Sequence, residues 1–144
     1  MKKYYIGIDP DAKASGFAIW DKEAQKLKYV KLLKFWELFH TLFGIKELHG
    51  AEVNVIIEAG WLNKGHWHPN KNQGVNVASR IGNNVGANHQ TGRIIEEMCQ
   101  YLKLDYQLVK PVKSKITAKT FEQVTGIKKS NQDTRDAVML VWGR

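Results

Sequence analysis

The sequence contains little cysteine and no long apolar run. Cys99 is its only cysteine, which excludes a disulfide within the chain and a zinc site built from cysteines alone. No stretch approaches the roughly 20 apolar residues of a membrane span. The opening residues, MKKYYIGIDP, lack the apolar segment and small-residue cleavage site of a signal peptide. We therefore expect a cytoplasmic protein without a membrane partner.

Acidic residues are scarce beside basic ones. The 144 residues include 22 Lys and Arg against 14 Asp and Glu, which gives a formal net charge of +8. Such an excess favours a polyanionic partner, because neutralising phosphates releases their counterions. A basic surface with an unrelated function would have the same composition, so charge alone only suggests nucleic acid. The length predicts a single domain over residues 1–144.

Prolines are also few, and Pro10 and Pro111 end predicted strands. Alternating or β-branched runs predict strands, and apolar residues at helical spacing predict helices. We expect strands at 3–9, 17–21, 26–33, 52–60 and 104–111, and helices at 35–50, 75–102, 113–126 and 133–143. This order predicts an α/β fold in which an antiparallel meander and the later strands form one mixed sheet flanked by helices.

Four acidic residues occupy positions where this fold would bring them together. Asp9 ends the first predicted strand, and Glu58 lies at the end of the fourth. Asp133 and Asp136 are three residues apart and share one face of the last helix. Binding sites in such sheets form at the carboxyl ends of central strands. Each acid also has an ordinary explanation, as a helix N-terminal charge, a turn residue or a solvated strand end.

Clustered carboxylates repel one another, and divalent cations supply the compensation that they need. Mg²⁺ prefers oxygen ligands and divides its coordination shell between carboxylates, waters and phosphate oxygens. Two such ions can activate a water and stabilise the leaving oxygen of a phosphodiester. The four acids therefore suggest a nuclease that uses Mg²⁺, with Mn²⁺ as a substitute and two ions in each site.

The ordered set of motifs resembles the RuvC-type Holliday junction resolvases of the RNase H-like superfamily. The resemblance is carried by IGIDPDAKASGFAI (6–19), VIIEAGW (55–61), GRIIEEMCQYL (92–102) with LVKPVKSKITAKTFEQV (108–124), and QDTRDAVML (132–140). It implies a five-stranded mixed sheet, in which a three-stranded antiparallel meander joins parallel strands. It also implies a homodimer that nicks two strands of a four-way DNA junction, with the dimer interface in the region of residues 75–102.

The resemblance assigns roles to individual residues. The metal ligands and catalytic acids would be Asp9, Glu58, Asp133 and Asp136. Lys113 and Lys119 fall in the family's lysine-containing stretch, so one of them is expected to approach the scissile phosphate; a solvated lysine face is the alternative. The segment after residue 58 differs from cellular bacterial resolvases, and the chain ends directly after the last helix. Both features suggest a phage-type or mobile-element relative that acts in a bacterial cytoplasm.

The loop at 61–74 and the helix after it are rich in cationic, amide and aromatic side chains, which suit contacts with phosphates and unpaired bases. The expected DNA-binding residues are Trp61, Lys64, His66, Trp67, His68, Lys71, Arg80, Arg93 and, further along, Lys115. One tryptophan could instead belong to the core. A zinc site at His66 and His68 is disfavoured, because no cysteine is nearby. His89 is a candidate for assisting water activation.

Other functions stay open at this point. A non-catalytic basic module that binds nucleic acid explains the charge and the loop but not the acids. A ribonuclease H that cuts RNA–DNA hybrids is the nearest enzymatic alternative, and the D-x-x-D-A motif at 133–137 favours the resolvase branch. An actin-like or sugar-kinase-like ATPase is disfavoured, because those proteins close two such domains around a nucleotide and this chain is too short.

Overall fold

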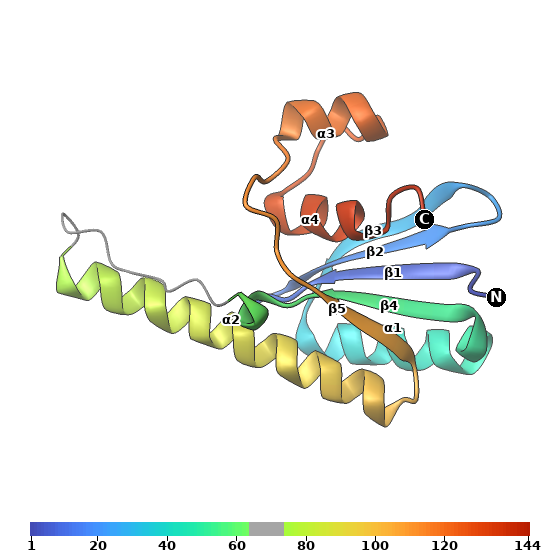
Figure 1. The fold of residues 1–144 in the computed structure, drawn as a ribbon, viewed down its shortest axis with the longest axis horizontal. Helices are drawn as coiled ribbons and strands as arrows, with labels where there is room; N and C mark the ends of the chain where they lie inside the picture. The colour runs from blue at the N-terminus through green and yellow to red at the C-terminus, as the bar shows by residue number, and fades with distance from the viewer. Residues whose placement is uncertain (64–73) are drawn as a thin grey trace.

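A five-stranded mixed sheet forms the centre of the molecule (Figure 1). The computed structural model describes residues 1–63 and 74–144. The strands are β1 (Tyr4–Asp9), β2 (Ser15–Asp21), β3 (Lys26–Leu33), β4 (Val53–Glu58) and β5 (Asp105–Val109). They lie in the order β3-β2-β1-β4-β5, and the first three strands pair antiparallel while β1–β4 and β4–β5 are parallel. The predicted meander extended by parallel strands is confirmed.

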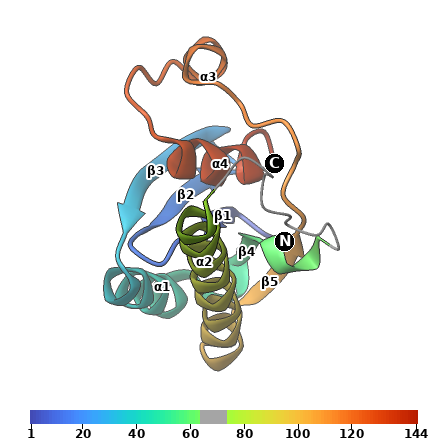
Figure 2. The same cartoon turned by 90° about the vertical axis from the view of Figure 1, so that its left-hand side faces the viewer.

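Helices cover both faces of this sheet. They are α1 (Phe35–His49), α2 (Val75–Tyr101), α3 (Ala118–Thr125) and α4 (Gln132–Val141), with short 3-10 turns η1 (Gly50–Glu52) and η2 (Gly60–Leu62) on either side of β4. Figure 2 shows α1 and α2 on one side of the sheet and α4 on the other, with α3 outside α4. Within residues 1–63 and 74–144, no helix combines the length and apolar character needed to cross a bilayer.

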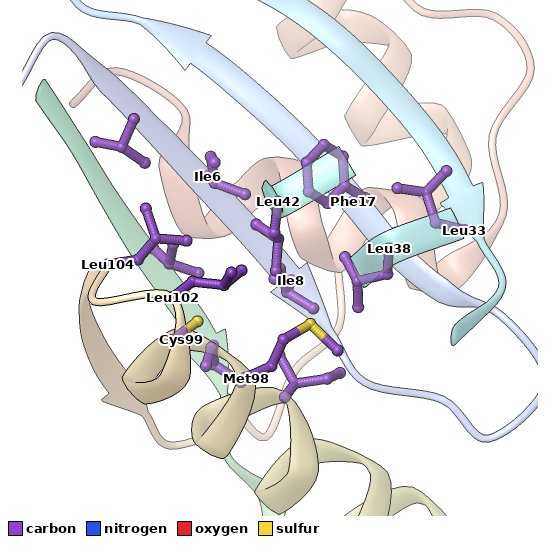
Figure 3. Packing of buried hydrophobic residues seen from close by; sticks show 14 residues of the cluster. Ile6, Ile8, Phe17, Leu33, Leu38, Leu42, Met98, Cys99, Leu102 and Leu104 are labelled. Carbon is purple, nitrogen blue, oxygen red and sulfur yellow. The ribbon is translucent and has the colours of Figure 1, made fainter. Parts of the chain in front are cut away.

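The two faces of β1 have different roles, because successive strand residues point to opposite sides of a sheet. Ile6 and Ile8 are fully buried in the larger core, which they share with Phe17 of β2, Leu42 of α1 and Met98 of α2 (Figure 3). The intervening residues of β1 face α4. The face with Ile6 and Ile8 therefore anchors α1 and α2. The opposite face packs a second apolar core against α4, which includes Ala18, Ala137 and Val138, and Asp9 lies at its carboxyl edge.

Two glycines let the backbone of α4 lie directly on the sheet. A Cβ atom on Gly7 of β1 would stand 2.1 Å from the carbonyl oxygen of Ala137. A Cβ atom on Gly16 of β2 would stand 2.0 Å from the carbonyl oxygen of Asp133. No side chain fits in either gap, so the close approach depends on glycine at both positions. This contact holds the first turns of α4 beside the carboxyl end of β1.

The third predicted helix begins later than expected. Residues 113–117 were predicted to be helical and are not, because Thr117 caps α3 by accepting a hydrogen bond from the Thr120 backbone N–H at 3.2 Å. The irregular segment between β5 and this cap, residues 110–116, is called the strap below. The predicted end of this helix holds, because Gly126 ends α3 in the left-handed conformation with φ of 79°. Asn131 then caps α4.

The remaining boundaries differ by a few residues. β2 begins at Ser15, two residues before the expected start. β4 ends at Glu58, as expected, although the β-branched run that predicts this strand continues to residue 60. α2 is helical over its whole length from Val75, although its glycines favour a later start.

Candidate metal centre

Three carboxylates converge at the carboxyl edge of the sheet. Asp9 ends β1 and Glu58 ends β4, and the parallel register that pairs Ile8 with Ile57 places these strand ends side by side. Asp136 reaches the same point from α4. One oxygen of each carboxylate lies within 4.8 Å of an oxygen of the other two. Segments that are far apart in the sequence therefore meet in one acidic cluster, which we call the carboxylate cluster (Asp9, Glu58 and Asp136).

Asp133 lies beside this cluster, one helical turn before Asp136. Burial raises the pKa of Asp133, as do the charges of Asp11 and Asp136, whereas a hydrogen bond with Asp9 lowers it. Its carboxylate does not belong to the compact group of three oxygens. Asp133 thus lies next to Asp9 and near Asp11 of the β1–β2 turn, outside the compact group of the other three acids.

Asp9 carries the strongest electrostatic strain in the site. Burial raises the pKa of its carboxyl group to about 9, and the charges of Glu58, Asp133 and Asp136 contribute in the same direction. The ammonium of Lys115 opposes this shift only in part. Without a further cation, Asp9 therefore holds a proton at neutral pH.

Lys115 in the strap is the cation that faces the cluster. Its Nζ atom lies 2.8 Å from Oε1 of Glu58 and 3.0 Å from Oδ2 of Asp136. Burial lowers the pKa of Lys115, but the hydrogen bonds to the two carboxylates outweigh this and leave the pKa raised. Lys113 and Lys119, the lysines expected near the scissile phosphate, are both exposed, and neither makes an ion pair within the described residues.

A polar network fixes the orientation of Asp136. The side-chain amide of Gln132 donates to Oδ1 of Asp136 at 2.8 Å, and Gln132 in turn accepts from Arg135 at 3.1 Å. Arg135 also donates to the Ser130 hydroxyl at 3.0 Å. Both oxygens of the buried Asp136 are therefore bonded. Sequence reasoning missed Gln132, although its spacing of four residues from Asp136 on a helix is the signal for such a contact.

Two clefts open on either side of the cluster. One, of ≈ 170 Å³, lies between the cluster and α2 and is lined by Asp9, Pro10, Glu58, Gly60, Trp61, Val85, Asn88 and His89. The other, of ≈ 350 Å³, lies between the strap and α4 and is lined by apolar and polar side chains in equal number, Glu58 and Asp136 among the polar ones. A ligand bound in either cleft would therefore lie next to the carboxylates.

The predicted DNA-binding residues occupy different environments. Trp61 is half-buried: it packs against the larger core, and a Cβ atom on Gly92 would stand 2.3 Å from its ring. The guanidinium carbon of Arg93 lies 6.0 Å from the centre of that ring, and Arg80 is exposed on α2. His89 meets Trp61 edge-on, with ring centres 6.5 Å apart.

Other predicted contacts fall on residues 64–73, which lie outside the described parts of the chain. They are Lys64, His66, Trp67, His68 and Lys71, and they include the pair considered for zinc.

The donor atoms suit a hard divalent cation. Carboxylate oxygens are the ligands that Mg²⁺ and Mn²⁺ prefer in proteins. The cluster already attracts a positive charge, because the Lys115 ammonium is bound between two of its three members. Asp9, Glu58 and Asp136 would therefore hold a metal ion, and Asp133 is close enough to Asp9 to assist a second one.

Comparison with solved structures identifies the fold. The chain matches T. thermophilus RuvC in complex with a Holliday junction substrate at a TM-score of 0.56 and 12% sequence identity, over 95% of this chain and 89% of that chain. It matches a Thermus thermophilus RuvC structure at a TM-score of 0.52 and 13% identity, over 95% and 90% of the two chains. No protein-family model and no curated protein matches the sequence. The chain therefore has the RuvC-like, RNase H-like fold that its motifs predict.

Proposed function

We propose that this protein is a metal-dependent, structure-selective DNA endonuclease that hydrolyses phosphodiester bonds at four-way or other branched junctions. The observation that carries the proposal is the carboxylate cluster, in which Asp9, Glu58 and Asp136 meet within 4.8 Å at the carboxyl edge of the sheet. One of the structures that share the fold is a RuvC bound to a Holliday junction substrate. The cluster thus lies on a scaffold that serves junction binding in another protein.

The metal that we propose is Mg²⁺, with Mn²⁺ as a substitute and two ions in each site. When bound, such ions would lower the pKa of a coordinated water and stabilise the leaving oxygen of the phosphodiester. Asp9, Glu58, Asp133 and Asp136 would hold them. Gln132 keeps Asp136 in one orientation through its 2.8 Å hydrogen bond, so little rearrangement of that ligand is needed.

DNA would approach along the cleft between the cluster and α2. Asn88 and His89 line this cleft together with Trp61, and the guanidinium carbon of Arg93 lies over the Trp61 ring, 6.0 Å from its centre. These side chains offer donors and an aromatic edge for phosphates and unpaired bases. The net charge of +8 would strengthen the attraction of the whole molecule to DNA.

A homodimer is part of the proposal. Figure 1 shows the N-terminal half of α2 extending beyond the sheet, and Val75 and Val77 on this half are exposed. A two-fold axis that pairs these halves would cover the apolar side chains and present two sites to a symmetric junction.

The test is cleavage of matched substrates: a four-way junction, a Y-fork, a linear duplex and an RNA–DNA hybrid, each with Mg²⁺ and with EDTA. We expect Mg²⁺-dependent cutting of the junction by the wild-type protein. Asp136→Asn should bind the junction without cutting it. The control is Glu122→Gln, which also replaces a carboxylate by an amide but at an exposed position on α3. This variant should cut the junction as the wild type does.

Three outcomes would contradict the proposal. Full activity of Asp136→Asn would remove the cluster from the mechanism. A junction that is shifted in a gel but never cut, with Mg²⁺ or Mn²⁺, would support a non-catalytic nucleic-acid-binding module. Preferred cutting of the hybrid would identify a ribonuclease H activity instead.

A further inference from the structure

The ammonium of Lys115 occupies part of the space that a metal ion would need. It bonds Oε1 of Glu58 at 2.8 Å and Oδ2 of Asp136 at 3.0 Å, and these belong to two of the three carboxylates that would bind metal. Among the described residues, it is the one cation that forms an ion pair with the carboxylate cluster. A lysine and a divalent ion cannot share these oxygens freely, because both are positive and they would repel each other at contact distance.

The contact also fastens the strap to the rest of the molecule. Residues 110–116 belong to no helix or strand, and Val112 on this segment is 67% exposed. Within the described parts of the chain, the hydrogen bonds that reach the cluster from the strap come from Lys115 alone. Val112, Ser114 and Ile116 line the cleft beside α4, so the position of Lys115 affects the shape of that cleft.

We propose that Lys115 is an internal counter-ion that competes with metal for the carboxylate cluster and thereby sets its affinity for divalent ions. Metal binding displaces the ammonium from Glu58 and Asp136, and the strap loses its polar anchor in the same step. The inference rests on one part of the proposed function, namely that the carboxylate cluster binds metal. Lys115 acts here as a residue that controls site occupancy, and the tests below need neither DNA nor cleavage.

Calorimetric titration of the metal-free protein with Mn²⁺ and with Mg²⁺ tests the competition. Lys115→Met should bind either ion roughly tenfold more tightly than the wild type, because both the competing ligand and the repelling charge are removed. Lys115→Arg, which keeps the charge, should bind about as weakly as the wild type. Lys128→Met removes one positive charge at an exposed position in the α3–α4 loop and should leave the affinity unchanged.

A second measurement uses the unmodified protein, so it does not depend on how a variant folds. Amine acylation followed by mass spectrometry compares Lys115 with Lys113, which lies two residues away and is exposed. Without metal, Lys115 should react several-fold more slowly, because its ammonium is engaged by two carboxylates. Saturating Mg²⁺ should bring the rate of Lys115 close to that of Lys113 and leave the rate of Lys113 unchanged.

The outcomes separate this inference from the proposed function. If Asp136→Asn abolishes metal binding while Lys115→Met binds like the wild type, the competition is overturned and the metal site stands. Unchanged or slower acylation of Lys115 in Mg²⁺ overturns it as well. If the wild-type protein and Lys115→Met both bind no metal, the inference and the proposed metal centre fail together.

Discussion

Neutralising Asp9 should make the metal-free protein more stable. Its carboxyl pKa is raised from 3.8 to about 9 by burial and by the neighbouring acids. At neutral pH the folded protein must therefore keep a proton on Asp9 that the unfolded chain would release. Asp9→Asn removes this cost and retains the shape of the side chain.

The size of the effect follows from the pKa. At pH 7 only the part of the shift from a pKa of 3.8 up to 7 contributes, which is about three pKa units. At about 1.4 kcal/mol per unit, this part lowers the free energy of unfolding by at most about 4 kcal/mol. Asp9 is only partly buried, and water screens part of its interactions. We therefore expect Asp9→Asn to raise the free energy of unfolding in EDTA at pH 7 by about 1–2 kcal/mol.

The sign of the pH dependence is specific to an acid whose pKa rises on folding. Below the unfolded pKa, Asp9 is protonated in both states and the substitution changes little. As the pH rises from about 4 toward 9, the unfolded state ionises first, so the wild-type protein loses stability relative to Asp9→Asn. The advantage of the variant should therefore increase through this range and then level off.

Urea unfolding in EDTA at pH 4.5, 7 and 8.5 measures this difference, with Glu122→Gln as the exposed control. Addition of Mg²⁺ should then stabilise the wild type and leave Asp9→Asn unchanged, which reverses their order if metal binds tightly enough. An Asp9→Asn protein that is less stable than the wild type in EDTA at pH 8.5 would refute the reasoning. So would a difference that does not vary with pH.

Two further substitutions test how the site is built. Gly16→Ala would force a methyl group into the backbone of α4, so we expect it to lower the free energy of unfolding by about 2–3 kcal/mol in the same urea assay. The control is Gly44→Ala on α1, where a Cβ atom meets nothing within 4 Å. This control should be neutral or should raise the free energy of unfolding by up to about 1 kcal/mol. Gln132→Ala should weaken metal binding roughly tenfold in calorimetry, because Asp136 loses its 2.8 Å hydrogen bond, whereas Gln123→Ala on the exposed side of α3 should not. A tolerated Gly16→Ala, or unchanged metal affinity in Gln132→Ala, would contradict the respective argument.

The order and type of the elements could be predicted because they depend on local patterns. Alternation predicts β3 over its observed residues, Lys26–Leu33, and the β-branched run at 52–60 predicts the buried β4. Gly126 and Asn131 signal the end of α3 and the start of α4 through capping chemistry. The strap could not be predicted in this way, because Thr117 is the N-cap at which α3 begins and the sequence pattern alone does not separate this start from one at residue 113.

Local sequence patterns do not show which of three nearby lysines contacts the carboxylates. Lys113, Lys115 and Lys119 look alike in the sequence, and the family resemblance favours the first and the last as catalytic. The structure places the Lys115 ammonium at the carboxylates, whereas the other two lysines form no ion pair within the described residues. An irregular segment has no period, so its sequence does not specify which side chain points inward.

The sequence by itself determined a mixed α/β sheet and the placement of acids at two strand ends and on the last helix, because hydrophobic period, capping and turn chemistry act over a few residues. Only the tertiary structure decided that α4 lies close enough for Asp136 to meet Asp9 and Glu58, since that distance depends on Gly7 and Gly16 admitting a helix backbone onto the sheet. It also decided which cation balances the cluster, because that choice depends on packing between distant segments.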